Sequence, residues 1–216
     1  MIAALLCAGT SLSAWAQTVQ QQAAVDPGPG LVGTTYSEVE AGYQKQQGNP
    51  SHVRDLGFAY NQAIQKSGDW GLDANFSYAY LTGNAYGTRD YRNDVQVGLT
   101  AFMMQPWGKP FVTADGGYAW QNAGDVSRKG FIYTLTGGVE FQVLRDLALT
   151  PFMEYQAEPK FYNHERPVAN FPDYGWDYGV KATYRFTREW SASVTLDLDQ
   201  YSGSDLGVRA GVEYKF

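Results

Sequence analysis

The chain has 216 residues, of which 15% are aromatic and 18% are charged, and its formal net charge is −6 at pH 7. The aromatic content excludes a disordered acidic protein, and the negative charge argues against a nucleic-acid partner, because a basic face is needed to neutralise phosphates. A mean hydropathy of −0.37 and the lack of an apolar run of about 20 residues exclude a helical membrane protein. The length suits one domain.

The first sixteen residues predict an export signal. They are apolar or small after Met1, carry no charged side chain and end in Ala14-Trp15-Ala16, which is the small-x-small pattern of a signal-peptidase site. Cleavage after residue 16 would remove Cys7, the only cysteine, so the exported chain would contain no disulfide. Residues 17–33 show no periodicity and contain a Pro-Gly cluster, which predicts a flexible periplasmic lead-in to a domain over 34–216.

From residue 34 onward, apolar and polar residues alternate in segments of ten to fourteen residues. Side chains on a strand alternate between its two faces, so each segment predicts a strand with one apolar and one polar face. The pattern is clear over 70–80, 94–103, 175–186, 190–199 and 206–216. It is weaker over 35–46, 54–64, 110–121, 130–143 and 147–158. Ten strands are therefore expected, or eight if two of the weaker segments are loops.

The connections between these segments also alternate. Short turns are expected at 66–69, 105–109, 144–146 and 187–189. The connections between them are expected at 47–53, 81–91, 121–130, 159–173 and, as a short one, 201–204. Short turns at one end and generally longer loops at the other are typical of an antiparallel up-and-down barrel in an outer membrane. An even number of strands places both termini on the short-turn side, which is the periplasmic side.

Three features favour a membrane barrel over a soluble, lipocalin-like barrel, which uses the same alternation. The alternate strand positions that form the apolar face, called the apolar parity from here on, carry almost no charged residues. The chain also ends in Tyr214-Lys215-Phe216. The aromatic residues fall into two bands by height, as in the girdles at the two bilayer interfaces. The band near the short turns comprises Trp70, Trp107, Phe111, Phe186, Trp190 and Phe216. The band toward the loops comprises Tyr78, Tyr80, Tyr118, Trp120, Tyr133, Trp176 and Tyr178.

With these features, residues 34–216 resemble the small outer-membrane β-barrels of Gram-negative bacteria, the broad porin-like and OmpA-like group. The resemblance implies an outer-membrane location and contacts with lipid and lipopolysaccharide. It also implies that Tyr214 and Phe216, in the terminal strand, form the signal that the barrel-assembly machinery recognises. Small ions are possible further partners, and the residues give no oligomeric state.

Charged residues on the polar parity should face the lumen. Near the seam where the last strands meet the first, their signs alternate from strand to strand, and opposite charges on neighbouring strands should pair. This predicted charge ladder comprises Lys181, Arg185, Asp197, Asp199, Arg209, Lys215, Glu38 and Glu40. A symmetric hairpin at 201–204 would place Asp197 opposite Arg209.

The second to seventh predicted strands carry inward acids without an inward lysine or arginine. These acids are Asp55, Asp73, Asp94, Asp115, Glu140 and Glu154. Asp115 and Glu154 should lie nearer mid-height. The acidic wall is either hydrated and hydrogen-bonded to polar neighbours or a narrow path that prefers cations, because rings of Asp and Glu select cations.

No catalytic, cofactor or metal site is predicted, and an enzyme is not expected. The two histidines, His52 and His164, fall in predicted loops rather than on inward strand positions beside a base. The sequence therefore predicts a structural barrel or a narrow, cation-preferring channel. The alternative is a surface-binding barrel that acts through the loop 159–173, with a barrel-embedded hydrolase as a third possibility. Recognition candidates in that loop are Phe161, Tyr162, His164 and Arg166.

Overall fold

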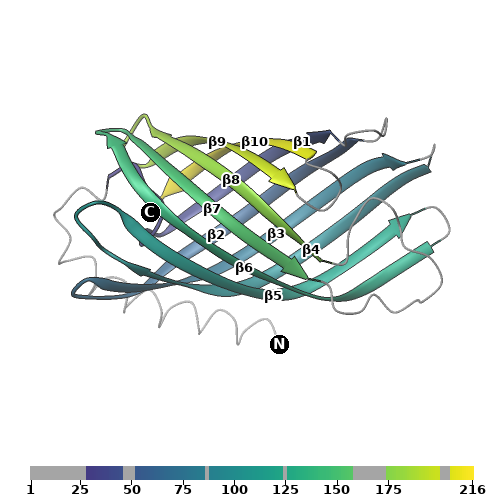
Figure 1. The fold of residues 1–216 in the computed structure, drawn as a ribbon, viewed down its shortest axis with the longest axis horizontal. Helices are drawn as coiled ribbons and strands as arrows, with labels where there is room; N and C mark the ends of the chain where they lie inside the picture. Colours follow the sequence, from purple (N-terminus) through teal and green to yellow (C-terminus); the bar gives the residue numbers. More distant parts are fainter. Residues whose placement is uncertain (1–27, 46–51, 86–87, 124–125, 158–173, 200–204) are drawn as a thin grey trace.

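The computed structural model describes residues 28–45, 52–85, 88–123, 126–157, 174–199 and 205–216. Within these ranges ten antiparallel strands close into one barrel (Figure 1). They are β1 (Tyr36–Lys45), β2 (His52–Ser67), β3 (Trp70–Ala85), β4 (Thr88–Met103), β5 (Lys109–Ala123), β6 (Val126–Leu144), β7 (Leu147–Ala157), β8 (Tyr174–Arg185), β9 (Trp190–Asp199) and β10 (Asp205–Lys215). The prediction of ten strands is confirmed, and the alternative of eight is wrong.

The barrel closes through ten register pairs between β1 and β10, from Tyr36 opposite Lys215 to Lys45 opposite Leu206. Every other strand pairs with its neighbours in the sequence. Closure leaves no strand edge with unpaired backbone groups, which is the condition for placing a sheet in lipid.

The two faces of the wall differ as an outer-membrane barrel requires. Val97 and Phe131 on the outer face are 59% and 74% exposed, whereas Ser191 and Glu213 on the inner face are 0% exposed. A soluble barrel would bury its apolar face instead, so the lipocalin-like alternative is wrong. Phe111 departs from the predicted outer band of aromatics, because its half-buried side chain lines a cavity inside the barrel. No helix among the described residues is long and apolar enough to cross a membrane.

Both ends of the barrel can be named from the chain path. At the terminal end, β1 begins, β10 ends, and tight turns join β2 to β3, β4 to β5, β6 to β7 and β8 to β9. The opposite end is the loop end. Two predicted long loops there are largely strand, because pairing continues from Leu81 opposite Arg92 to Ala85 opposite Thr88, and between Ala123 and Val126. These hairpins lengthen the wall instead of forming loops.

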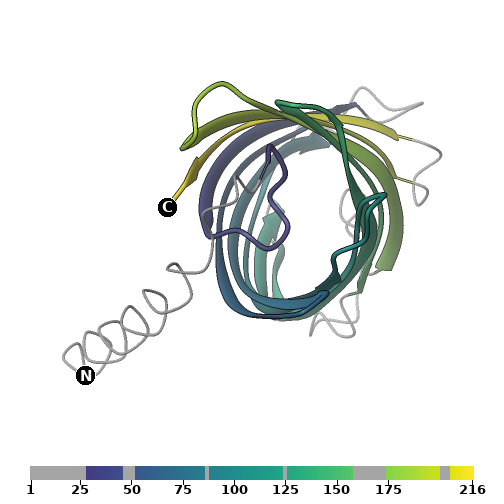
Figure 2. The same cartoon turned by 90° about the vertical axis from the view of Figure 1, so that its left-hand side faces the viewer.

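Residues 28–35 do not form a flexible lead-in, which corrects the prediction for the end of segment 17–33. They turn into the barrel at its terminal end, where the chain is drawn in purple inside the mouth (Figure 2). Pro29, Gly30 and Leu31 are buried. The rest of that segment and the predicted signal peptide lie outside the described residues.

Two glycines on neighbouring strands test the wall's packing. A Cβ on Gly98 of β4 would lie 2.3 Å from the Ala114 carbonyl oxygen, whereas a Cβ on Gly116 of β5 would meet nothing within 4 Å. We expect Gly98→Val to lower the free energy of unfolding by about 1–3 kcal/mol, because a backbone atom cannot move aside. Gly116→Val should be nearly neutral, since β-branched residues suit strands. Urea unfolding in detergent, followed by tryptophan fluorescence, measures both, and equal losses would contradict the register.

Candidate functional site: the barrel lumen

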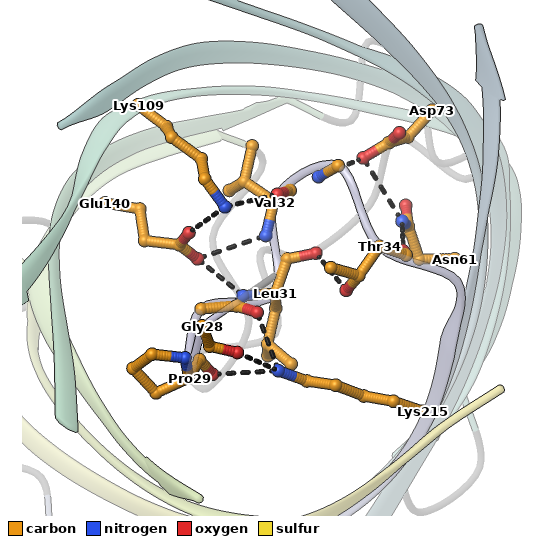
Figure 3. A network of polar contacts seen from close by, with 12 residues as sticks. Gly28, Pro29, Leu31, Val32, Thr34, Asn61, Asp73, Lys109, Glu140 and Lys215 are labelled. Carbon is orange, nitrogen blue, oxygen red and sulfur yellow. Dashed lines mark hydrogen bonds and ion pairs between the residues drawn. The ribbon is translucent and has the colours of Figure 1, made fainter. Parts of the chain in front are cut away.

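Residues 28–34, called the plug segment from here on, lie inside the lumen at its terminal end (Figure 3). The segment contains a tight turn in which the Thr34 amide and hydroxyl both donate to the Leu31 carbonyl oxygen, at 3.1 and 2.7 Å. Gly33 is the third residue of this turn and has φ +77°, a conformation that glycine adopts without a steric penalty.

Two wall carboxylates accept hydrogen bonds from the plug segment's amides. Glu140 Oε2 on β6 accepts from the Leu31 and Val32 nitrogens, at 2.6 and 3.0 Å. Asp73 Oδ2 on β3 accepts from the Gly33 nitrogen at 2.9 Å. Hydrogen bonds to charged groups each stabilise a fold by roughly 1.5–3 kcal/mol, so these carboxylates hold the turn firmly.

Lys215 on β10 binds the other side of the plug segment. Its Nζ donates to the carbonyl oxygens of Gly28, Pro29 and Gly30, at 3.2, 3.0 and 2.8 Å. These three bonds use all the donors of one ammonium group. Lys215 therefore acts on the plug segment and not as a member of the predicted ion-pair ladder.

Lys109 and Asn61 on the wall also bind the plug segment. Lys109 Nζ on β5 donates to the Val32 carbonyl oxygen at 2.9 Å and lies 3.0 Å from Glu140 Oε1. Asn61 Nδ2 on β2 donates to the Thr34 carbonyl oxygen at 2.6 Å. Five side chains from five different strands thus converge on one short stretch of main chain.

The plug segment separates two cavities. On its inner side, a mid-lumen cavity of about 230 Å³ is lined by Leu31 and Val32 together with wall residues such as Asp115 and Lys181. On its terminal side, a cavity of about 170 Å³ is lined by Pro29 and Gly30 together with the turn between β4 and β5. Glu140 lines both.

At the closure seam, two cations pair with carboxylates from other strands, and the first of them, Lys181 on β8, reaches across the lumen to β1 and β10. Lys181 Nζ lies 2.5 Å from Glu38 Oε1 and 3.7 Å from Glu213 Oε1. Glu38 and Glu213 are direct partners across β1 and β10, where like charges would repel without a cation between them. Glu213 shares the inward parity of Arg209 and Lys215 on β10, although the predicted ladder did not include it.

The second cation of the seam is Arg209. Its guanidinium lies 3.8 Å from Glu40 Oε1 and 3.5 Å from Asp197 Oδ1. The predicted alignment of Asp197 with Arg209 is wrong, because Asp197 stands opposite Gly207 and Arg209 opposite Thr195. The pair forms diagonally, since a long arginine side chain reaches past one residue pair.

Of the two further members of the predicted ladder, one has a different partner and the other is not tested. Arg185 pairs with Asp146 in the turn between β6 and β7, with Nη2 2.9 Å from Oδ1, so it anchors a turn at the terminal end. The side chain of Asp199 lies outside the described residues.

The acidic wall faces inward but is not free of cations. Arg92 Nε lies 2.7 Å from Asp94 Oδ1, and Lys109 pairs with Glu140. The expectation of no inward lysine or arginine is therefore wrong. Arg92 lies between the expected loop 81–91 and the expected strand 94–103, and Lys109 lies in an expected turn, but both belong to strands and share the inward parity.

Four acids of the wall remain without an ion pair among the described residues: Asp55, Asp73, Asp115 and Glu154. The Thr136 hydroxyl donates to Glu154 Oε2 at 3.0 Å. Asp115 lines the mid-lumen cavity. Asp55 and Glu154 line a third cavity, of about 270 Å³, toward the loop end.

This loop-end cavity is strongly acidic. Six carboxylate residues and one arginine, Arg209, line it. The acids are Glu40, Asp55, Asp94, Glu154, Asp177 and Asp197. They come from β1, β2, β4, β7, β8 and β9, so the acidic lining surrounds the lumen. The loop-end and mid-lumen cavities share Ala59 and Ser77 and therefore adjoin.

The recognition candidates of the predicted loop 159–173 lie outside the described residues; they are Phe161, Tyr162, His164 and Arg166. The Tyr214 ring contacts those of Trp190 and Phe216 edge-on, each at 5.0 Å between centroids, and the Phe216 nitrogen donates to the Thr35 carbonyl oxygen at 3.1 Å. Their role as an assembly signal stays a prediction. The described residues contain no group of three or more histidine, cysteine or acidic residues placed to hold a metal ion.

No family model matches the chain, and no curated protein matches it in sequence. Among solved structures, the beta domain of the Bordetella autotransporter BrkA aligns with a TM-score of 0.50 at 13% identity, covering 85% of this chain and 99% of that one. An outer-membrane channel from Pseudomonas putida F1 aligns at 0.48 and 10% identity over 89% and 100% of the two chains. The NanC porin aligns at 0.47 and 14% identity over 83% and 100%.

The alignment with a TM-score of 0.50 shows a shared fold and, at 13% identity, no more than that. The closed ten-stranded antiparallel barrel, with an apolar outer face and a polar lumen, has the architecture of a small outer-membrane β-barrel. The fold resemblance inferred from the sequence is confirmed.

The seam gives a stability prediction. Lys181→Met should lower the free energy of unfolding by about 3–5 kcal/mol, because it leaves Glu38 and Glu213 buried without a cation. Lys66→Met, at an exposed position on β2, is the matched control and should have little effect. Adding Glu38→Gln to Lys181→Met should recover part of the loss. Urea unfolding measures all three variants, and a neutral Lys181→Met would contradict the role of this lysine.

Proposed function

We propose that the protein is an integral outer-membrane barrel whose lumen forms a narrow, cation-preferring channel. The observation that carries the proposal is the loop-end cavity, which six carboxylate residues and one arginine line. Rings of acidic side chains favour cations and repel anions, as in other cation-selective pores.

The local charge balance supports the preference for cations. Arg209 is held by Glu40 and Asp197, and Asp94 by Arg92. Asp55 and Glu154 have no such ion pair among the described residues, so their charges act on the contents of the cavity. Because the barrel wall and the surrounding lipid have a low dielectric constant, each charge acts more strongly there than in bulk water.

The lumen dimensions support a narrow path for ions over one for large solutes. Two adjoining cavities of about 230 and 270 Å³ lie in the lumen between the plug segment and the loop end. A barrel of ten strands encloses more space than one of eight strands, in which side chains fill the interior. It encloses far less space than the barrels of sixteen or more strands in large porins.

The apolar outer face supports the membrane location. Trp70, Trp107 and Trp190 are exposed near the terminal end, where an interfacial aromatic band would lie. Aliphatic residues such as Val97 and Leu99 are exposed farther along the wall. In this proposal the terminal end faces the periplasm, and the resemblance to non-enzymatic barrels fits a channel better than a hydrolase.

Conductance measurements test the channel. We expect the refolded protein in a planar bilayer under a salt gradient to show cation-selective current. Asp115→Asn/Glu154→Gln should lower the ratio of cation to anion permeability several-fold, because it removes two lumen charges without an ion pair. Asp69→Asn/Glu189→Gln, which neutralises two exposed acids in terminal-end turns, is the matched control and should change the ratio little. Equal selectivity in all three proteins would contradict the proposal.

A second measurement tests the membrane-facing surface. Val97→Lys should destabilise the barrel in lipid vesicles by about 2–4 kcal/mol, because it places a charge on the lipid face near mid-height. Gln65→Lys, exposed near the terminal end, should cost at most about 1 kcal/mol. Equilibrium unfolding from vesicles compares the two, and equal costs would place Val97 outside the hydrocarbon region.

A further inference from the structure

We propose that Asn61, Asp73, Lys109, Glu140 and Lys215 form an exchangeable binding site for peptide main chain, called the main-chain site from here on. Its resident ligand is the plug segment, and the class of ligand it accepts is a short glycine-rich peptide. Occupancy of this site closes the terminal mouth of the lumen.

The contacts recognise backbone atoms. Eight hydrogen bonds between described residues join the five wall side chains to amide nitrogens or carbonyl oxygens of residues 28–34. Carboxylates meet the amides, and ammonium or amide donors meet the carbonyls. A site built in this way recognises the course of the peptide backbone. It selects among side chains only by leaving no room for those that clash with the wall.

The excluded side chains define the ligand as glycine-rich. A Cβ on Gly30 would lie 1.9 Å from Glu140 Oε1, the oxygen that Lys109 also holds. A Cβ on Gly33 would lie 2.6 Å from the Phe102 ring, and both Gly28 and Gly33 have φ +77°. Phe102 shares the inward parity with Thr100 and is buried, a position that parity alone could have assigned.

The plug segment can leave without opening the wall. Residues 28–34 belong to no strand, and β1 pairs with β10 only from Tyr36 onward. The wall groups that the segment covers border two cavities, so water can take over their hydrogen bonds. If these polar wall groups faced lipid instead, no water would be present to replace their hydrogen bonds.

The position of the plug segment links occupancy of the main-chain site to the length of the open path through the lumen. It stands between the mid-lumen and terminal-side cavities, and Glu140 lines both. Vacating the main-chain site would join these cavities and extend the path toward the terminal mouth.

A pair of full-length variants tests the site. Gly30→Val/Gly33→Val weakens the resident ligand by steric exclusion and leaves all five wall side chains intact. Gly116→Val/Gly137→Val is the matched control, because a Cβ at either position meets nothing within 4 Å. The slower migration of heated than of unheated protein in detergent gels establishes that each variant is a folded barrel.

The first readout is binding of a dye-labelled synthetic peptide with the sequence of residues 26–35, followed by fluorescence anisotropy in detergent. We expect at least tenfold tighter binding to Gly30→Val/Gly33→Val than to the wild type or the control, whose sites are occupied. Adding Lys215→Met to the first variant should abolish the gain, and a peptide carrying the same two valines should not bind. Equal peptide binding to the wild type and the folded Gly30→Val/Gly33→Val variant would overturn the proposal.

The second readout rests on the proposed channel function. In planar bilayers, Gly30→Val/Gly33→Val should stay open longer than the wild type, and peptide added on the terminal side should close it again. If the variant binds the peptide but never conducts, the proposal of the main-chain site stands and the proposal of a channel is contradicted. A variant that conducts as the wild type does and binds no peptide would overturn the main-chain site and keep the channel.

Discussion

Pairing of β1 with β10 is the constraint on which the rest of the structure depends. It closes the sheet over ten register pairs and leaves no strand edge. A closed wall in lipid must turn its apolar parity outward, so every charged residue on the other parity enters the lumen. The lumen then has to neutralise or hydrate these charges. The seam shows how this is done: Glu38 and Glu213 face each other directly across β1 and β10, and Lys181 from β8 reaches both.

The charged side chains of the lumen have different partners at its two ends. Toward the loop end, carboxylates outnumber the single lining guanidinium, and the cavity remains acidic. At the terminal end, charged side chains find the main chain of the plug segment: Glu140 and Asp73 bind its amides, and Lys215 and Lys109 bind its carbonyls. The inward charges therefore serve two purposes: those toward the loop end line an acidic cavity, and those at the terminal end bind the plug segment.

The fold was accessible from the sequence because strand periodicity is a local property. Alternation from Trp70 to Tyr80 or from Leu206 to Phe216 identifies both the strand and its outward face without knowledge of its neighbours. The strand ends were harder to predict. Residues 81–85 and 88–91 contain turn-forming and charged residues, but hairpin pairing between β3 and β4 keeps them extended. That error hid Arg92, which neutralises Asp94 on the same strand.

The sequence by itself determined the number of strands, the apolar and polar faces, and most of the charges that enter the lumen, because each follows from a period of two along the chain. The inward Arg92 and Lys109 were missed because they lie just beyond the predicted strand ends. Only the tertiary structure decided which charges meet. The tertiary structure placed Arg209 in a diagonal contact with Asp197, because the β9–β10 register sets Asp197 opposite Gly207, and it paired Arg185 with Asp146 in a turn. It also brought Asn61, Asp73, Lys109, Glu140 and Lys215 from five strands around residues 28–34. A Pro-Gly stretch without periodicity carries no sign of this, since its order comes from partners up to 187 residues away in the chain.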